Sequence, residues 1–422
     1  MPATQYAQLE SVTRQMYEKE VVQQYVDEAL FLNEFVDKKP GKWVNQKGYE
    51  ITSEFSPDSS HGYISAGGAN PAGGSRSRAK MYVGYARYRK TLEYDNDSLD
   101  DLMNGNQDMQ LDFATDVQRC TASGIREAEE ACWGDGTGIK AVVGTGSTTT
   151  SIVLTTTPTT TPFTSKGAEF LYENVPYDWY TSAGVFTEGN IRASAVTKGT
   201  SPTLTPASTL SGSPAATDIL VLAGSYNKVH RGMRYLYGNG SGLKQGLLMS
   251  SFNELKTPQL DLAGAPLQPS DVLRLRNRIR YRSGVKSGKG MMIVGSITQI
   301  EAYNRTGFNF LQLGVGQNWD GVVNKSTMGG VTPMELTTCD EDTLWFINGD
   351  DIGKIEKMPW GFIPTKQGQI WHQKSGSNGT GADAQYATMG MNINLYTKRP
   401  NSGGVIVRAS VSGLSTSSNS RS

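Results

Sequence analysis

The sequence predicts an α+β protein whose elements follow one another along the chain instead of forming one compact core. Three observations support this class. A two-armed extended segment leads directly into a long amphipathic helix between Trp43 and Trp133. A β-rich stretch follows, and the C-terminal half then mixes helix-like and strand-like patterns. Glycine, with 48 copies among 422 residues, exceeds its usual share of about 7% and indicates many turns.

The first 41 residues are predicted to form an N-terminal arm. From Leu9 to Val36, apolar residues recur every three to four positions between charged ones, which predicts a helix, and Pro40-Gly41 ends it. Two placements remain open for this helix. It packs on its own domain or it reaches a neighbouring subunit.

Residues 42–95 are predicted to form an extended β-hairpin loop. Its arms, Lys42–Phe55 and Lys80–Tyr94, are rich in aromatic and β-branched residues, and the stretch between them is rich in Gly and Ser. An isolated two-stranded hairpin is marginally stable in water and has two unpaired edges. We therefore expect this arm to lie on something else, most simply on a neighbouring subunit.

Residues 96–143 are predicted to form a peripheral region around a spine helix. Asp95-Asn96-Asp97-Ser98 supplies an N-cap, and Gly134-Asp135-Gly136 ends the apolar periodicity. An uninterrupted helix of about 35 residues would be about 50 Å long. Without sustained heptads, such a helix favours a spine for other elements over a coiled coil.

Residues 144–224 are predicted to form an all-β insertion, either a small barrel or a sandwich. Short apolar runs at about ten-residue spacing are separated by Gly and Pro. The Thr/Ser tract contains the apolar run Ile152–Leu154, and the predicted strands after it include Phe170–Tyr172, Trp179–Tyr180, Ile191–Ala193 and Asp218–Leu222. A disordered linker is the alternative for the Thr/Ser tract Ser147–Thr161 alone.

Residues 225–411 are predicted to mix helices and strands, and the Ser-rich tail 412–422 is expected to be flexible. Pro269-Ser270-Asp271 starts a helix that runs to about Tyr281 and carries arginines at alternating positions. The remaining predictions are strands at Met291–Gly295, Gly329–Leu336, Thr343–Ile347, Ala387–Tyr396 and Val405–Val407, and a helix at Ser296–Tyr303.

Composition excludes several classes of partner and compartment. Forty basic and forty acidic residues cancel, so no global field favours nucleic acid or an anionic membrane. No run of about 18 apolar residues is present, and the N-terminus has no signal-peptide core. Three cysteines do not make a disulfide framework, which favours folding in a reducing cytosol.

The sequence predicts no enzyme, no cofactor and no metal site. None of the three histidines pairs with Cys or an acid at metal-ligand spacing, and no Ser or Cys lies in an activation motif. The stretch Ser283–Gly290 resembles a phosphate-binding loop. Gly290 stands where such a loop needs a hydroxyl group, and the stretch precedes a strand instead of following one, so we reject that reading.

Clustered charges are the remaining candidate sites. The basic cluster on the extended loop could bind nucleic acid, but ion pairs with an adjacent subunit's acidic surface are favoured. The Arg-rich helix 274–282 has the same two interpretations, with a solvated or inter-subunit face favoured over a phosphate track. The residues predicted to make inter-subunit contacts are Arg76, Arg78, Lys80, Glu127, Glu129 and Glu130.

This order of elements resembles the major capsid proteins of tailed bacteriophages, which have the HK97-type fold. Met389–Tyr396, followed by Pro400 and Val405–Val407, looks like the family's C-terminal strands. Met291–Tyr303 and Gly330–Met334 look like the core of its axial domain. The resemblance covers most of the chain and is architectural.

The resemblance implies self-assembly into hexamers and pentamers of an icosahedral head that encloses double-stranded DNA without sequence-specific binding. It implies a location in the virion after assembly in the host cytoplasm, with no membrane partner. It also implies an N-arm (1–41), an extended loop (42–95), a peripheral domain (96–143), an insertion domain (144–224), an axial domain with return strands (225–411) and a tail (412–422).

Because only about 40 residues precede the extended loop, we expect a separate scaffolding protein instead of a fused scaffold. A portal and a cement or decoration protein are further implied partners. Some family members crosslink a loop lysine to a neighbour's Asn. Lys47 and Lys80 are available here, but such a crosslink is not favoured.

Three alternatives remain. An encapsulin-like compartment shell would share the fold, and its contents, enzyme cargo in place of nucleic acid, would identify it. A β-rich tail or adhesin protein is opposed by the long helix near the start. A hydrolase would need an acid–base constellation that the sequence does not display.

Overall fold

The computed structural model describes residues 30–34, 43–44, 48–55, 78–104, 107–155, 170–198, 201–240, 242–284, 290–311, 328, 331–364, 368–375 and 381–409. The chain divides into two compact units whose segments alternate along the sequence. Unit 1 comprises 1–38, 85–132 and 354–394, and unit 2 comprises 39–84, 133–353 and 395–422. The expected mixed α+β class is confirmed, and most of the predicted N-arm and all of the tail lie outside the described residues.

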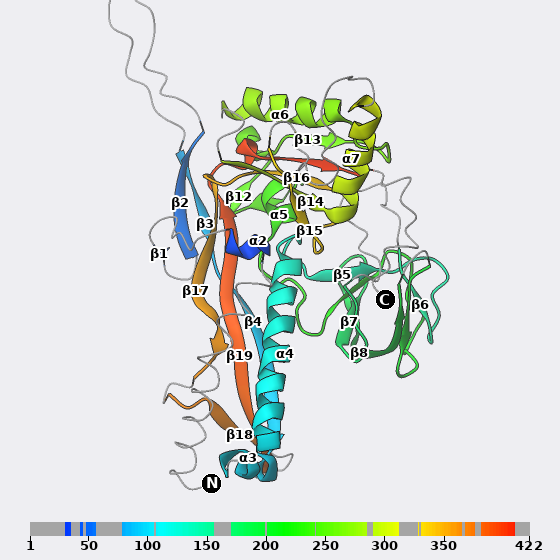
Figure 1. The fold of residues 1–422 in the computed structure, drawn as a ribbon, viewed down its shortest axis with the longest axis vertical. Coiled ribbons are helices and arrows are strands. Elements are labelled where there is room, and N and C mark those ends of the chain that lie inside the picture. Colours follow the sequence, from blue (N-terminus) through cyan, green and yellow to red (C-terminus); the bar gives the residue numbers. More distant parts are fainter. Residues whose placement is uncertain are drawn as a thin grey trace, which may run out of the picture. The chain divides into compact units, whose positions relative to one another are not determined.

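Unit 1 is built on a long antiparallel ladder. Strand β4 (Ala86–Asp95) pairs with β19 (Gly381–Thr397) from Ala86↔Ile393 to Asp95↔Ala384. On the other side of β19 lie β17 (Ile352–Phe362) and β18 (Trp371–Ser375). Helix α4 (Gln107–Ala131) runs along β4 (Figure 1). Phe113, Val117 and Ile125 are among its buried residues, so one apolar face of α4 covers the ladder.

The predicted spine helix is present but interrupted, so the expectation of one uninterrupted helix was wrong. It consists of α3 (Asn96–Met103) and α4, and α3 ends at the C-cap residue Asn104. Asp95 is the N-cap of α3, as predicted, and its side chain accepts a hydrogen bond from the Ser98 amide at 2.9 Å. In the sequence Asn104 is followed by a glycine, which costs about 1 kcal/mol inside a helix relative to alanine, so little stability is lost when α3 ends at Asn104.

The second predicted arm of the hairpin is also divided. Strand β2 (Gly48–Glu54) pairs with β3 (Arg78–Val83), and β1 (Trp43–Val44) pairs with β2. The chain leaves strand conformation at Gly84 and Tyr85, and β4 then pairs with β19 instead of β2. The hairpin β2–β3 therefore belongs to unit 2, whereas β4 belongs to unit 1.

Unit 2 contains a six-stranded sheet that closes on itself. Its order is β5-β10-β7-β8-β9-β6. A bridge between Val143 and Leu154, with backbone hydrogen bonds Gly144→Val153 and Thr155→Val142, joins the two edges. The strands are β5 (Ile139–Val142), β6 (Ile152–Val153), β7 (Pro176–Tyr180), β8 (Phe186–Thr197), β9 (Thr203–Pro206) and β10 (Ile219–Leu222). We call this element the barrel; Phe170–Tyr172, predicted as a strand, is not one.

The second core of unit 2 is a five-stranded sheet in the order β13-β20-β16-β14-β15. Helices α6 (Pro269–Ser283) and α7 (Ile297–Leu311) pack on it, and Val272, Leu275 and Ile279 of α6 join its apolar cluster (Figure 1). The strands are β13 (Gln259–Asp261), β14 (Met291–Ser296), β15 (Met334–Leu336), β16 (Leu344–Asn348) and β20 (Gly404–Val407). The predicted strands at 291–295, 343–347 and 405–407 and the helix beginning at 269 are confirmed within a few residues; the helix predicted at 296–303 is present but runs on to Leu311.

Short elements complete unit 2. The small hairpin of β11 (Leu243–Lys244) and β12 (Leu247–Leu248) lies beside β3, where the Tyr82 amide donates a hydrogen bond to the Gln245 carbonyl at 2.8 Å. The others are α5 (Met233–Tyr237), η1 (Asn253–Leu255) and η2 (Pro400–Ser402). In unit 1, α2 (Leu30–Asn33) is the described part of the predicted arm helix.

Candidate functional site

The described residues hold few groups suited to catalysis. His230 is buried, and its pKa falls to about 4 because burial and the nearby Lys140 disfavour its charged form. His372 stacks on Tyr386 at 5.2 Å, and His61 lies outside the described residues. Within the described ranges, no three His, Cys, Asp or Glu side chains gather as metal ligands.

The three thiols are equally unsuited to nucleophilic attack. Cys120, Cys132 and Cys339 are buried, and burial raises the pKa of each thiol above its usual value. The sequence interpretation of Cys120 and Cys132 as small core residues is consistent with this burial. In the described part of the chain, no helix has the length and apolar character that a membrane crossing requires.

The described cations of the hairpin are paired across its two strands. Arg78 lies 3.4 Å from Glu54, and the Lys80 ammonium lies 2.9 Å from Glu50. The Glu50 carboxylate raises the pKa of Lys80. Both cations remain more than half exposed, so their ion pairs leave donors free for another carboxylate. Arg76, the third predicted contact residue, lies outside the described residues.

The acidic side of the predicted contact differs from the expectation. Glu129 is 2% exposed, and its two carboxylate oxygens accept hydrogen bonds from the backbone amides of Phe31 (2.9 Å) and Leu32 (3.2 Å). Burial raises the pKa of Glu129 to about 7, against the lowering effect of these two bonds. Glu130 is also buried and accepts from Arg126 at 3.2 Å.

Glu129 and Glu130 are therefore interior groups of unit 1 and do not form the acidic surface that was expected. Glu129 instead holds the start of α2, whose first amides have no partner within the helix. Glu127 is half-buried on α4. Sequence reasoning missed this because the burial of Glu129 depends on a segment 97 and 98 residues away in the chain.

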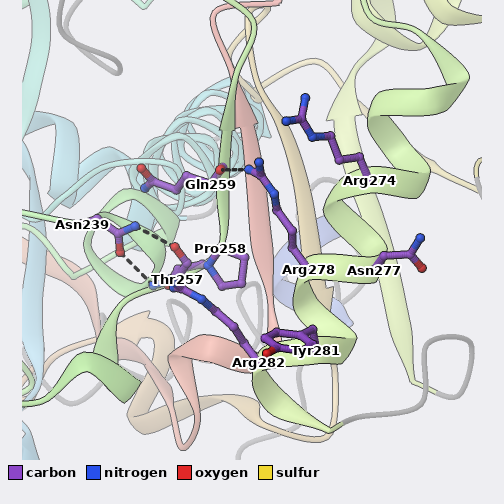
Figure 2. A pocket seen from close by; sticks show the side chains of 9 residues that line it. All are labelled: Asn239, Thr257, Pro258, Gln259, Arg274, Asn277, Arg278, Tyr281 and Arg282. Carbon is purple, nitrogen blue, oxygen red and sulfur yellow. Dashed lines mark hydrogen bonds between the residues drawn. The ribbon is translucent and has the colours of Figure 1, made fainter.

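Unit 2 has a groove between α6 and the segment 257–259, which we call the α6 groove. Its volume is about 680 Å3. Figure 2 shows Arg278 and Arg282 reaching from α6 toward this segment. The lining residues are Asn239, Thr257, Pro258, Gln259, Arg274, Asn277, Arg278, Tyr281 and Arg282.

Hydrogen bonds fix the wall opposite α6. The Asn239 side chain donates to the Thr257 carbonyl at 2.6 Å and accepts from the Thr257 amide at 2.7 Å. The Thr257 hydroxyl donates to the Pro400 carbonyl at 3.1 Å, and Arg278 donates to the Gln259 carbonyl at 3.1 Å. The wall is therefore rigid, and it presents carbonyl groups that orient arginine side chains.

Helical geometry divides the arginines of α6 between two faces. Arg274, Arg278 and Arg282 recur every four residues and lie in one row along the groove, about 6 Å apart along the helix axis. Arg276 and Arg280 lie on a different face. Sequence reasoning noted only that the arginines alternate; applying the 3.6-residue period would have shown the row.

No family model and no curated protein sequence matches the chain. Among solved structures, the chain is similar to the capsid asymmetric unit of cyanophage A-1(L), with 11% identity, a TM-score of 0.48, and coverage of 90% of this chain and 91% of that one. It is also similar to the capsid of a native GTA particle, with 8% identity, a TM-score of 0.44, and coverage of 87% and 86%.

A third similar structure is the SrpI encapsulin of Synechococcus elongatus, with 9% identity, a TM-score of 0.26, and coverage of 37% of this chain and 54% of that one. The descriptions of these structures name two capsids and one encapsulin complex.

Proposed function

We propose that this chain is the major capsid protein of a tailed bacteriophage and that it assembles into the hexamers and pentamers of an icosahedral head around double-stranded DNA. One observation carries the proposal. The hairpin β2–β3 is anchored at its base and by the Phe55 ring, which packs on Phe252 at 4.5 Å, but residues 52–54 and 78–80 between these anchors are exposed or half-buried, and Arg78 and Lys80 pair with glutamates of the facing strand. Such an element gains stability from a neighbouring copy.

The buried and exposed residues of the hairpin support this division. Tyr49, Ile51, Met81 and Val83 are buried near the base, where the Tyr82 amide bonds to Gln245. Farther along, Glu54 and Arg78 are exposed. A pair of strands with little apolar cover is marginal alone, so the exposed part of the hairpin, residues 52–54 and 78–80, is the natural contact with another subunit.

The proposed parts follow the resemblance. The N-arm ends near α2. The base of the extended loop is the pair β2 and β3, and the interrupted spine of the peripheral domain is α3 followed by α4. The barrel is the insertion domain, and the five-stranded sheet with α6 and α7 is the axial domain. Proposed partners are further copies of the chain, a separate scaffolding protein, a portal and a decoration protein. The role is structural and the location is the virion.

Negative-stain microscopy with sedimentation velocity of the purified full chain tests the proposal. We expect closed angular shells or rings of five and six subunits, with a scaffolding protein added where required. A monomer or small oligomer under both conditions would contradict a capsid role. Enzyme cargo in place of nucleic acid within shells would favour the encapsulin-like alternative.

A further inference from the structure

We infer that the α6 groove binds the phosphodiester backbone of nucleic acid through Arg274, Arg278 and Arg282, with Tyr281 as a platform for a base. This goes beyond the proposed function, on which it relies only for the source of the nucleic acid. Sequence reasoning favoured a solvated or inter-subunit face for this helix. The geometry of the groove instead favours phosphate binding over a solvated or inter-subunit face.

The charge of α6 has a single sign where it faces the groove. The helix carries five arginines and one acid, and that acid, Asp271, accepts a hydrogen bond from the Gln268 amide at 3.2 Å in the capping box at the helix start. The groove lining contains no carboxylate. An otherwise electroneutral chain thus concentrates positive charge along one row.

The arginine row also has a suitable spacing and donor geometry. The three arginines leave the helix about 6 Å apart along its axis, so their long side chains can each reach a different phosphate of one strand, which carries one charge per about 3.4 Å of axis. Arg binds phosphate through two parallel N–H donors, whereas Lys acts as a point charge, and α6 contains no lysine. The Gln259 carbonyl at 3.1 Å orients Arg278.

Tyr281 distinguishes nucleic acid from an acidic peptide. It is 92% exposed and lies among the arginines of the groove (Figure 2). A large aromatic side chain beside a cationic row is the arrangement on which bases stack in proteins that bind single strands. An acidic peptide would match the arginines but would leave this ring without a role.

The test is fluorescence anisotropy of the full chain with labelled 20-nucleotide DNA, as a single strand and as a duplex, over a series of salt concentrations. We compare the wild type with R274Q/R282Q, which retains Arg278 and its bond to the wall. The matched control is R119Q/R280Q, which removes the same charge at two exposed positions outside the groove.

We expect R274Q/R282Q to bind at least about tenfold more weakly at 0.1 M salt, with the slope of log K against log salt reduced by about 1.4 for single strands or about 1.8 for duplex. The control R119Q/R280Q should keep an affinity and a salt slope closer to those of the wild type. Y281A, compared with Y281F, should lose about fivefold or more on single strands only. An effect of arginine removal without an effect of Y281A would overturn the role of Tyr281 as a base platform and leave only phosphate binding by the arginines.

Equal binding by R274Q/R282Q and its control would overturn the inference. Loss of particles in R274Q/R282Q with unchanged DNA binding would also overturn it, in favour of an acidic protein partner. Groove-dependent DNA binding by a chain that forms no particles would leave this inference standing and reject the proposed function.

Discussion

The five-stranded sheet under α6 and the hairpin β2–β3 belong to the same unit, yet different forces hold them. Phe346, Val405 and Ile406 of the sheet are fully buried, so removal of apolar surface from water supplies its stability. The distal hairpin depends on backbone pairing, on the contact of Phe55 with Phe252, and on two ion pairs with exposed cations, which contribute little each. A region that cannot stabilise itself indicates where another molecule belongs.

The largest expected effect is in the sheet. Phe346→Ala should lower the free energy of unfolding by about 3–5 kcal/mol, because it leaves a cavity in a core that lies on both sides of β16. Urea unfolding of the purified chain measures this loss. A loss below about 1 kcal/mol would mean that the sheet is not the centre of stability in unit 2.

The next effect concerns Glu129. Burial raises its pKa to about 7 from an unfolded value of 4.5, so the folded state holds a proton that the unfolded state has lost between these two values. The stability contribution is fully present below pH 4.5 and is lost as pH rises to 7, by up to about 3 kcal/mol. Glu129→Gln should flatten this dependence in thermal midpoints between pH 5 and 8.

Glu130→Gln is the matched control for Glu129, because it changes the neighbouring buried carboxyl on the same helix. It should retain the fall in stability between pH 5 and 7. If both variants keep the fall, another group is responsible and the pKa of Glu129 is not raised.

Unit 2 should respond to pH in the opposite direction. Lys244 is fully buried, its ammonium donates to the Leu255 carbonyl at 2.7 Å, and burial lowers its pKa to about 7 from 10.5. The folded state therefore binds fewer protons than the unfolded state between pH 7 and 10.5, and stability should rise with pH across that window. Lys244→Met should remove the rise; an unchanged slope would contradict this account of Lys244.

A smaller effect is expected when the barrel is removed. Deletion of 146–222 would expose Ala141 and Val143 to water, because both belong to the barrel's apolar core and the rest of that core would be lost. The Asn227 amide bonds to the Thr137 carbonyl at 3.0 Å, so the chain enters and leaves the barrel at one place. Replacing 139–223 by a short Gly/Ser linker should leave the unfolding midpoint of the rest within a few degrees while weakening particles; insoluble protein would contradict this.

The smallest stability change is expected in the hairpin. Arg78→Glu with Lys80→Glu should alter unfolding by about 1 kcal/mol or less, because both side chains are exposed, yet it should reduce particle yield severely. Sedimentation velocity beside urea unfolding separates the two effects. Normal particles from this variant would show that Arg78 and Lys80 do not contribute to the contact between subunits.

The sequence predicted elements where local signals suffice. Asp95 caps α3, as its polar motif predicted. The start of α6 was also predicted from Pro269-Ser270-Asp271, although its N-cap is Gln268 and Asp271 completes the capping box. The strand at 343–347 could be predicted because a continuous apolar run suits a strand buried on both faces, and the structure confirms it.

Contacts between distant segments could not be predicted in this way. The arm Lys80–Tyr94 was treated as one strand, but β4 pairs with β19, about 300 residues away, and the chain changes partner at Gly84. The burial of Glu129 likewise depends on α2. Local patterns specify an element, whereas its partner depends on the tertiary fold.

Hydrogen exchange of assembled particles and of dissociated subunits tests most directly whether a second copy completes the hairpin. We expect the amides of 48–55 and 78–80 to exchange many times more slowly in particles, while those of β14, β16 and β20 exchange equally in both. Equal exchange of the hairpin in the two states would contradict the account, because no neighbouring copy would then cover it.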